Sequence, residues 1–361
     1  MSFNNSFFKN GQNANQNTNQ SNAQEIEIPQ APSDTVSCLK FSTDLSPATY
    51  LMAGSWDKTV KIWEITPQGQ PIFRAQQSFQ APVLDCCWSH DSTKAFISCT
   101  DNFGYMWNIA TQTVSQIAVH DAPIKIIKFI KATNYSCVMT GSWDKKLKFW
   151  DMVNNQPIKV MELSDKVYCA DVHYPMAVVG TADKKIYVYN LQTEPVEFKQ
   201  YPSQLKCQLR CIKIFLNKTT KEPAGFVVGS IEGRVGIQSM VNENTKDSFT
   251  FKCHRITAPT STIQEIFAVN DISIHPIHYT VVTMGSDGKI AYWDKESRTR
   301  LKSVDPQEQQ PVTVGDIDSK GNIFAYAMGY DWSKGHEFND VNKKPKLFIR
   351  ECNSDLTPAK K

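Results

Sequence analysis

The sequence lacks the features that define several common classes of protein. No apolar run approaches the roughly 18 residues that a membrane-spanning helix needs, so membrane insertion is excluded. Residues 1–10 carry one lysine and no apolar core, which argues against a signal peptide. The patterns GxxxxGKS/T, GxGxxG and HExxH are absent, and the histidines are scattered, so we expect no catalytic residues, cofactor, metal or small-molecule substrate.

The cysteines and the net charge also limit the classes of protein to which the chain can belong. The ten cysteines form no CxxC pair and have no histidine at ligand spacing, which indicates buried thiols in a reducing compartment. The formal net charge of +3 is too small to indicate nucleic-acid binding by itself. Hydrophobic residues make up 41% of the chain, which is enough to form a core.

What the sequence does contain is a recurring hairpin, seen most clearly at residues 138–151. An apolar run precedes a turn with Gly141 and Asp144, and Leu147 and Phe149 then alternate with lysines, as in a half-buried strand. The glycine gives the turn backbone freedom, and the aspartate can accept hydrogen bonds from nearby amides. One hairpin cannot bury its own apolar face, so repetition is expected.

The hairpin does recur. In five copies an acidic residue stands six positions before an aromatic one, and in a sixth copy Glu232 precedes Gln238: the five are Asp57 to Trp63, Asp101 to Trp107, Asp144 to Trp150, Asp183 to Tyr189 and Asp287 to Trp293. The copies lie roughly 40 to 55 residues apart, the period of a four-stranded propeller blade. With these motifs the chain resembles the WD-repeat family, which implies an all-β fold, a seven-bladed WD40 β-propeller.

The expected domain organisation is one propeller between two tails. Residues 1–24 are rich in Asn and Gln and are interpreted as a disordered tail, either solvated without a role or mixing with Phe-bearing tails of nuclear pore proteins. Residues 25–352 form the propeller, and residues 353–361 form a C-terminal tail. The alternating residues 25–28 are predicted to pair with residues 346–350 and so to close the last blade. The blades are predicted at residues 36–64, 83–108, 124–151, 167–190, 209–237, 272–294 and 312–349.

Blade 3 contains four residues whose types fit either a catalytic triad or a structural hydrogen-bond chain. His120, Ser142, Asp144 and Trp150 include the residue types of a hydrolase triad, but a nucleophile must be exposed, and here the aromatic side chain would cover it. The resemblance implies instead a structural hydrogen-bond chain from the histidine through the serine to the indole, tied to the turn aspartate. Blade 3 alone is expected to hold a complete set, and His254 is interpreted as a packing or surface residue.

Four segments narrow the resemblance to one branch of the WD-repeat family. Residues 229–235 with residues 251–255 are similar to a small branch of WD-repeat proteins, which contains the mRNA export factor of the nuclear pore and the kinetochore checkpoint adaptor. Residues 330–337 and 120–123 match the export factor and not the checkpoint adaptor. Long insertions on a rigid ring are where recognition commonly occurs.

The resemblance implies a partner and its binding residues. Proteins of this branch recognise the acidic GLEBS segment of their partners, and the residues equivalent to Arg234 and Arg255 grip paired glutamates. An arginine can hold a carboxylate with two parallel hydrogen bonds, which suits this role. On composition alone, the alternative is a pair of solvated surface arginines.

A second candidate edge comes from the same resemblance. In the export factor the corresponding residues form a basic, aromatic surface for viral proteins and single-stranded nucleic acid; here they are Phe251, Trp293, Asp294, Lys295, Arg298 and Arg300. Cations beside an exposed ring suit phosphates and stacked bases. The alternative is that Trp293, the core aromatic residue of its repeat, is buried.

Together these features predict a monomeric, non-enzymatic adaptor at the nuclear pore complex. It would bind the GLEBS segment of an FG nucleoporin, support mRNA export, possess a candidate contact with single-stranded RNA or mRNP, and reside in the nucleus and at the nuclear envelope with cytoplasmic shuttling. The alternative is a spindle-checkpoint adaptor that binds GLEBS segments of checkpoint kinases at kinetochores. A ubiquitin-ligase receptor is disfavoured because Trp150-Asp151 is not followed by the x-Arg of a Trp-Asp-x-Arg ending.

Overall fold

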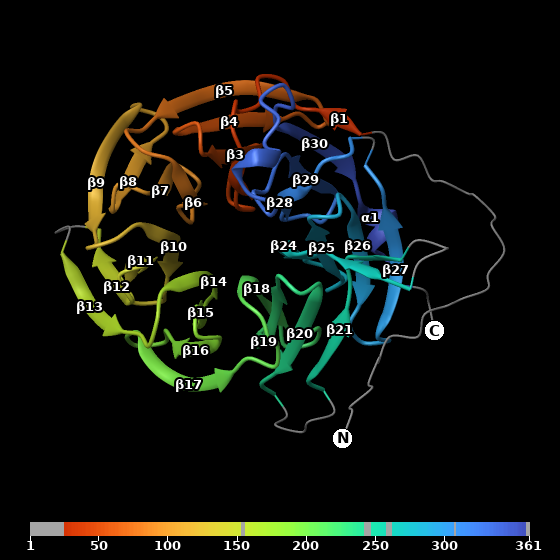
Figure 1. Cartoon of the computed structure of the whole chain (residues 1–361). Coiled ribbons are helices and arrows are strands. Elements are labelled where there is room, and N and C mark those ends of the chain that lie inside the picture. Colours follow the sequence, from red (N-terminus) through yellow and green to blue (C-terminus); the bar gives the residue numbers. More distant parts are fainter. Residues whose placement is uncertain (1–24, 153–155, 242–246, 258–261, 307, 359–361) are drawn as a thin grey trace.

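The described residues form a ring of β-sheets around a central channel (Figure 1). The computed structural model describes residues 25–152, 156–241, 247–257, 262–306 and 308–358. Within these ranges the chain forms seven four-stranded antiparallel sheets and one two-stranded hairpin. The predicted all-β, seven-bladed propeller is therefore confirmed. The predicted tail of residues 1–24 lies outside the described residues.

Each blade is a meander whose strands run in chain order from the channel to the outside. Blade 1 consists of β2 (Val36–Phe41), β3 (Thr49–Ser55), β4 (Thr59–Ile65) and β5 (Pro71–Ser78), and blade 2 of β6 (Val83–Trp88), β7 (Lys94–Cys99), β8 (Phe103–Asn108) and β9 (Thr113–Val119). Blade 3 consists of β10 (Ile124–Lys131), β11 (Ser136–Ser142), β12 (Lys146–Asp151) and β13 (Pro157–Glu162). Blade 4 consists of β14 (Val167–His173), β15 (Met176–Thr181), β16 (Lys185–Asn190) and β17 (Val196–Pro202). Blades 5 and 6 consist of β18 (Leu209–Leu216), β19 (Pro223–Ser230), β20 (Arg234–Ser239) and β21 (Phe249–Lys252); and β24 (Val269–Ile274), β25 (Val281–Gly285), β26 (Ile290–Asp294) and β27 (Thr299–Val304).

Blade 7 joins the two ends of the propeller. Its inner three strands are β28 (Val312–Ile317), β29 (Ile323–Met328) and β30 (Lys346–Glu351), and its outer strand is β1 (Ile26–Glu27). Ile26 pairs with Ile349, and the amide of Ile28 donates to the carbonyl of Leu347 at 2.8 Å. The predicted closure by residues 25–28 is confirmed.

The hydrophobic core is divided among the contacts between neighbouring blades. Seven clusters of buried apolar side chains are found among the described residues, and each one joins two adjacent blades. The repeat glycines make this contact possible: a Cβ on Gly141 would lie 2.8 Å from a methyl group of Val167 in the next blade. The sequence prediction of backbone freedom at Gly141 was wrong, because the turn residue with positive φ is Lys145, at 68°. Nine of the ten cysteines are buried, and all ten are free.

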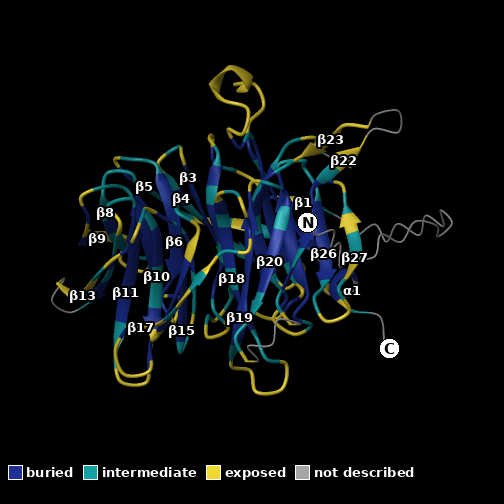
Figure 2. Cartoon of the chain, turned by 60° about the horizontal axis from the view of Figure 1, so that its bottom comes forward, coloured by how far each residue is buried: buried dark blue, intermediate teal, exposed yellow. Residues whose placement is uncertain are grey.

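The insertions of blades 5 to 7 protrude from one face, here called the upper face, which faces the viewer in Figure 1 and lies at the top in Figure 2. Between blades 5 and 6, β22 (Arg255–Thr257) and β23 (Gln264–Ile266) form an added hairpin. Between β29 and β30 the chain forms a long loop with the 3-10 helix η1 (His336–Phe338). The stretch between the predicted blades 5 and 6 is divided, because β21 is the outer strand of blade 5 and only the residues after it form the added hairpin.

The C-terminal residues also pack on the ring. Residues 353–361 were predicted as a tail, but the first of them form the short helix α1 (Asn353–Leu356). Leu356 is fully buried, and the carboxylate of Asp355 accepts a hydrogen bond from the guanidinium of Arg350 at 2.8 Å. No helix within the described ranges is long and apolar enough to cross a membrane. Those ranges also contain no cluster of three or more His, Cys, Asp and Glu side chains that could hold a metal ion.

Candidate partner-binding site

The two predicted arginines meet on the upper face at the edge of blade 5. Arg234 is the first residue of β20, directly after the turn from β19, and Arg255 is the first residue of β22. The guanidinium of Arg255 donates to the backbone carbonyl of Glu232 at 2.8 Å and to Oε1 of Gln264 at 3.2 Å. Nε of Arg234 lies 3.8 Å from Oε2 of the same Glu232. The two side chains therefore converge on one residue, as a site for a single acidic segment requires.

The electrostatics of this arginine pair favour an added carboxylate. Burial lowers the pKa of Arg255, and the positive charge of Arg234 lowers it further. Nε of Arg255 is buried and has no hydrogen-bond partner among the described residues. The Glu232 carboxylate lies at long range from Arg234 and also accepts from the amide of Lys206 at 3.0 Å. An acidic side chain from outside would accept from the terminal nitrogens of the two guanidinium groups and offset their like charges.

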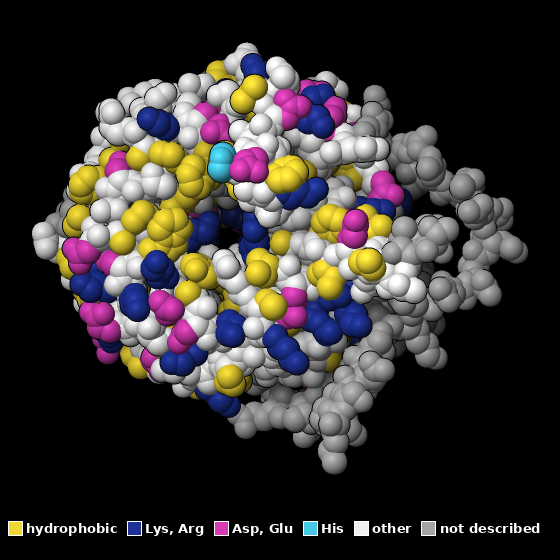
Figure 3. All heavy atoms as spheres, in the orientation of Figure 1, with side chains coloured by type: hydrophobic (Ala, Val, Ile, Leu, Met, Phe, Trp, Pro, Cys, Tyr) yellow, Lys and Arg dark blue, Asp and Glu magenta, His cyan; other side chains and the backbone are white. Residues whose placement is uncertain are grey.

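Apolar side chains surround the channel mouth on the same face, where the cavity has a volume of about 640 Å³ (Figure 3). Trp56, Trp143 and Trp332 line this cavity, and Trp56 and Trp332 are 41% and 45% exposed. Exposed indoles are costly in water and are common where partners bind. The sequence analysis missed these three residues. The available signal was an aromatic residue inside otherwise polar turns, as in Gly54-Ser55-Trp56-Asp57.

The predicted basic, aromatic edge is only partly present. Phe251 and Trp293 are 2% and 5% exposed and pack on each other with ring centroids 4.7 Å apart. The indole of Trp293 also donates to Oγ1 of Thr283 at 3.0 Å. These two rings belong to the core between blades 5 and 6, so their predicted role as exposed stacking surfaces was wrong. The alternative of a buried Trp293 holds.

The polar residues of that edge lie around the turn from β26 to β27. The carboxylate of Asp294 accepts from the amide of Glu296 at 3.0 Å and from the hydroxyl of Ser297 at 2.6 Å, so it shapes the turn. Lys295 pairs with Glu296 and lies 4.7 Å from the ring of Phe215. The guanidinium of Arg298 lies 4.4 Å from the ring of Phe249, and Arg300 is exposed on β27.

The arginine pair and the basic edge do not come together. In an antiparallel meander, alternate turns lie at opposite ends of the strands. The turn from β19 to β20 lies on the upper face, so the turn from β26 to β27, one connection further along its blade, lies on the lower face. A single short peptide cannot contact both sets.

The blade 3 constellation is a buried hydrogen-bond chain, but its hydroxyl is not that of Ser142. The indole of Trp150 donates to Oγ1 of Thr140 at 2.7 Å, and Nε2 of His120 lies 2.8 Å from the same oxygen. Nδ1 of His120 lies 2.7 Å from the carboxylate of Asp144. Ser142 instead donates to the carbonyl of Ala122 at 3.0 Å. Its predicted place in the chain was therefore wrong.

The donors and acceptors of this chain agree with a neutral His120. The indole only donates, so the Thr140 hydroxyl accepts from it. Nδ1 of His120 faces the Asp144 carboxylate, which accepts from it, and in a neutral ring Nε2 is then the acceptor of the Thr140 hydrogen. Burial lowers the pKa of His120, in agreement with a neutral ring. Burial opposes ionisation of Asp144, yet the hydrogen bonds that it accepts, first among them the one from His120, bring its pKa to about 2.

Blade 6 holds a second complete chain. Nδ1 of His254 lies 2.8 Å from Asp287, and its Nε2 lies 2.9 Å from Oγ1 of Thr283, the acceptor of the Trp293 indole. The prediction that blade 3 alone is complete was wrong. All four side chains are buried or have little exposed surface, so the chain braces the blade and presents no nucleophile to solvent.

The fold and repeats define the class of protein. The family model described as WD domain, G-beta repeat matches residues 24–64 and 112–151, which cover β1 to all but the last residue of β4, and β9 to β12. Together with seven four-stranded blades closed by β1, this match places the chain among the WD40-repeat propellers.

Comparison with known proteins gives the family. The chain is 48% identical over 345 residues to Protein Rae1 of Drosophila melanogaster, covering 96% of this chain and 98% of the relative. It is 47% identical over 331 residues to mRNA export factor rae-1 of Caenorhabditis elegans, covering 91% and 88%. It is 49% identical over 339 residues to the mRNA export factor of Rattus norvegicus, covering 93% and 92%. The chain belongs to the Rae1 family of mRNA export factors.

Proposed function

We propose that this protein is a non-enzymatic adaptor in mRNA export that binds an acidic segment of the GLEBS type in an FG nucleoporin. The proposal places it in the nucleus and at the nuclear pore complex, with cytoplasmic shuttling, as one propeller in a heteromeric assembly. Two relatives named mRNA export factor match this chain over 88% and 92% of their own length. The observation that carries the peptide-binding part is the convergence of Arg234 and Arg255 on Glu232.

The geometry of this face supports the proposal of an acidic peptide. Two guanidinium groups beside one distant carboxylate leave donors for two further acidic side chains, each of which an arginine can hold with paired hydrogen bonds. The indoles at the channel mouth lie on the same face and offer apolar area for the rest of the segment. Charge at the rim and aromatic area near the centre is the usual division of roles in a protein interface.

The test is the affinity of the full-length protein for a GLEBS-type peptide, measured by fluorescence anisotropy. Arg234→Glu and Arg255→Glu should each weaken binding by more than tenfold, about 1.4 kcal/mol. Arg74→Glu is the matched control, because Arg74 is an exposed arginine paired with Glu64 on the outer strand of blade 1. Unchanged affinity in both charge reversals would remove the proposed site.

We further propose that single-stranded RNA or mRNP contacts the lower face through Lys295, Arg298 and Arg300. The support is a cavity of about 430 Å³ whose lining includes Lys218, Lys295 and Arg298. Since the two proposed sites lie on opposite faces, Arg298→Glu with Arg300→Glu should weaken binding of an oligouridine and spare the peptide. The reversals at Arg234 and Arg255 should do the opposite. Equal loss of both ligands in either variant would count against two separate sites.

A further inference from the structure

The seven inner strands present their second residues to the channel as one ring, which we call the mouth ring. Its members come from β2, β6, β10, β14, β18, β24 and β28 in turn: Ser37, Leu84, Lys125, Tyr168, Arg210, Asn270 and Thr313. All seven line both the cavity at the channel mouth and the smaller cavity of about 110 Å³ directly below it. Two of the seven are cations, so the ring carries a formal charge of +2.

The charges deeper in the channel come from three lysines and four carboxylates, whereas the charged residues of the mouth ring are both cations. Lys40 pairs with Asp316 at 3.5 Å, Lys213 pairs with Asp171 at 3.6 Å, and Lys128 pairs with Asp85. The fourth carboxylate, Asp271, accepts from the amides of Ile272 and Gly315 at 2.8 and 3.3 Å. Among the described residues, no hydrogen bond or ion pair joins Lys125 or Arg210 to a carboxylate. The nearest acid below Lys125 is Asp85, which is already held by Lys128 and by the amides of Cys86 and Ile127.

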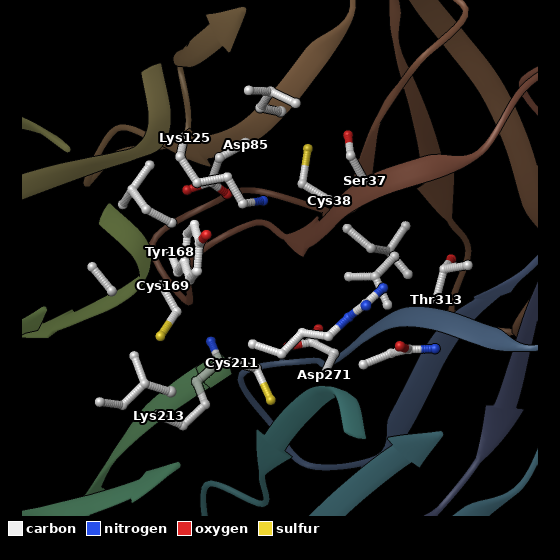
Figure 4. Close-up of a pocket in the computed structure, with 18 of the residues that line it drawn as sticks. Ser37, Cys38, Asp85, Lys125, Tyr168, Cys169, Cys211, Lys213, Asp271 and Thr313 are labelled. Carbon is white, nitrogen blue, oxygen red and sulfur yellow. The ribbon is translucent and has the colours of Figure 1, made fainter. Parts of the chain in front are cut away.

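The acid near the rim of the cavity is occupied as well. Asp331 lines the channel mouth, but its carboxylate accepts from the side chains of Asn270 and Ser286 and from the amide of Ser333. Lys125 extends into the channel from β10, and Tyr168 stands next to it on β14 (Figure 4). Arg210 projects from the following blade, on β18. The cavity floor thus has two cations, neither of them in an ion pair among the described residues, on the two blades that flank the blade of Tyr168.

We propose that the channel mouth is a binding site for a phosphoryl group, held between Lys125 and Arg210. A phosphoryl group can accept from both cations of the ring at once. The ammonium, the guanidinium fork and the Tyr168 hydroxyl provide donors for the three terminal oxygens of a phosphomonoester. The cavity above the ring is far larger than a phosphate ion and has indole walls, so the ligand carries an apolar or aromatic body.

The cations of this site are distinct from the two arginines of the proposed peptide site, although both proposals use the indoles at the channel mouth. The mouth ring lies on the inner strands of the blades, whereas Arg234 and Arg255 lie beyond β19 at the edge of blade 5. The phosphoryl site therefore does not depend on the proposed function. The double variant Arg234→Glu, Arg255→Glu should keep it unchanged.

The experiment is titration of the full-length protein with phenyl phosphate, phenyl sulfate and inorganic phosphate, followed by calorimetry and by tryptophan fluorescence. Phenyl phosphate should bind roughly tenfold or more tightly than either reference, because phenyl sulfate has one charge fewer and inorganic phosphate lacks the ring. Its binding should also change the tryptophan emission, since Trp56 and Trp143 line the cavity. Absence of phenyl phosphate binding at millimolar concentration would overturn the proposal.

Substitutions test whether Lys125 and Arg210 bind the phosphoryl group. Lys125→Met and Arg210→Met should each weaken phenyl phosphate by about tenfold or more, and Arg210→Lys should restore part of the affinity. Lys166→Met is the matched control, an exposed lysine just before β14 that does not line the cavity. Thermal unfolding should show no loss of stability in either Met variant, since each removes an unpaired cation. Equal affinity in wild type and both variants would overturn the assignment.

A last comparison distinguishes two sources of the phosphoryl group. A capped peptide with one phosphoserine is titrated beside phenyl phosphate and beside its unphosphorylated form. Tighter binding of the phosphopeptide than of phenyl phosphate would assign the site to a modified partner protein. Tighter binding of phenyl phosphate would assign it to a free phosphate ester. A peptide that binds equally with and without its phosphate would overturn the phosphoryl assignment for that source.

Discussion

Blades 2 and 3 have the same four strands and the same turn aspartate, but their buried indoles are in different environments. In blade 3 the indole of Trp150 donates to Thr140, which continues through His120 to Asp144. In blade 2 the indole nitrogen of Trp107 is buried and has no hydrogen-bond partner among the described residues. The position of Thr140, just before the Gly141-Ser142 pair, is occupied in blade 2 by Ile97.

The place of the histidine also differs. The amide of His120 donates to the carbonyl of Asn102 in the turn of blade 2, and the amide of Phe79 donates equivalently to Lys58 in the turn of blade 1. An apolar ring, Phe79, therefore occupies in blade 2 the place that His120 has in blade 3. Blade 2 is held by apolar packing, and blade 3 adds a buried polar network. The comparison teaches that the propeller geometry does not require the network, so its contribution can be measured.

The largest effect is expected for Thr140→Val. The substitution keeps the shape of the side chain but leaves the Trp150 indole and Nε2 of His120 buried without partners. Two such losses should lower the free energy of unfolding by about 2 to 4 kcal/mol, measured by urea denaturation. Thr283→Val should have a similar effect through the equivalent chain in blade 6.

The control for size is Ile97→Val, which removes one methylene from the equivalent position of blade 2. It should cost only about 1 kcal/mol. If Thr140→Val were no more damaging than Ile97→Val, the network in blade 3 would contribute nothing beyond packing.

A smaller effect is expected in the pH dependence of stability. Burial lowers the pKa of His120, so on acidification the unfolded chain binds a proton near its ordinary pKa while the folded chain does not. Stability should therefore fall as the pH drops below about 6.5, by at most about 1.4 kcal/mol per pH unit. The urea midpoint should change less steeply with pH in His120→Gln than in the wild type. In His90→Gln, which changes an exposed histidine, the wild-type slope should remain; identical slopes in all three proteins would contradict the assignment.

The smallest effect is expected when blade 2 is given a hydroxyl. Ile97→Thr places an acceptor where Thr140 stands in blade 3, and the new hydrogen bond from Trp107 should offset most of the lost apolar burial. The net change should stay within about 1 kcal/mol. In a Trp107→Phe background the new hydroxyl has no indole from which to accept a hydrogen bond, so the same substitution should lower the free energy of unfolding clearly more. Equal costs in both backgrounds would show that Trp107 does not use the new acceptor.

The fold could be predicted because its determinants are local. The aspartate of each turn and the aromatic residue six positions later lie within one hairpin, so their spacing survives in every blade that has them. The closing strand was predictable for the same reason: residues 25–28 alternate, stop at Pro29, and have one complementary strand at the far end of the chain.

The site was predictable only where sequence distance reflects spatial distance. His120 lies 24 positions before Asp144, but the hairpin of β22 and β23 lengthens the equivalent separation of His254 and Asp287 to 33, so the second chain was missed. Thr140 and Ser142 point to the same side of β11 because side chains alternate along a strand. Which of the two hydroxyls meets the indole depends on the register, which pairs Trp150 with Val138. Alternation also turns Phe249 and Phe251 inward together, which no local pattern distinguishes from an exposed edge.

The two-residue strand β1 has a consequence for the order of events during synthesis. It leaves the ribosome before the other strands of the ring, yet the strand that it must pair with, β30, is made after all of them. Until then six sheets can form but the circle stays open, with the flank of blade 1 unprotected. A ribosome that stops before β30 therefore releases an incomplete chain with two unpaired edges, which chaperones and proteases can recognise.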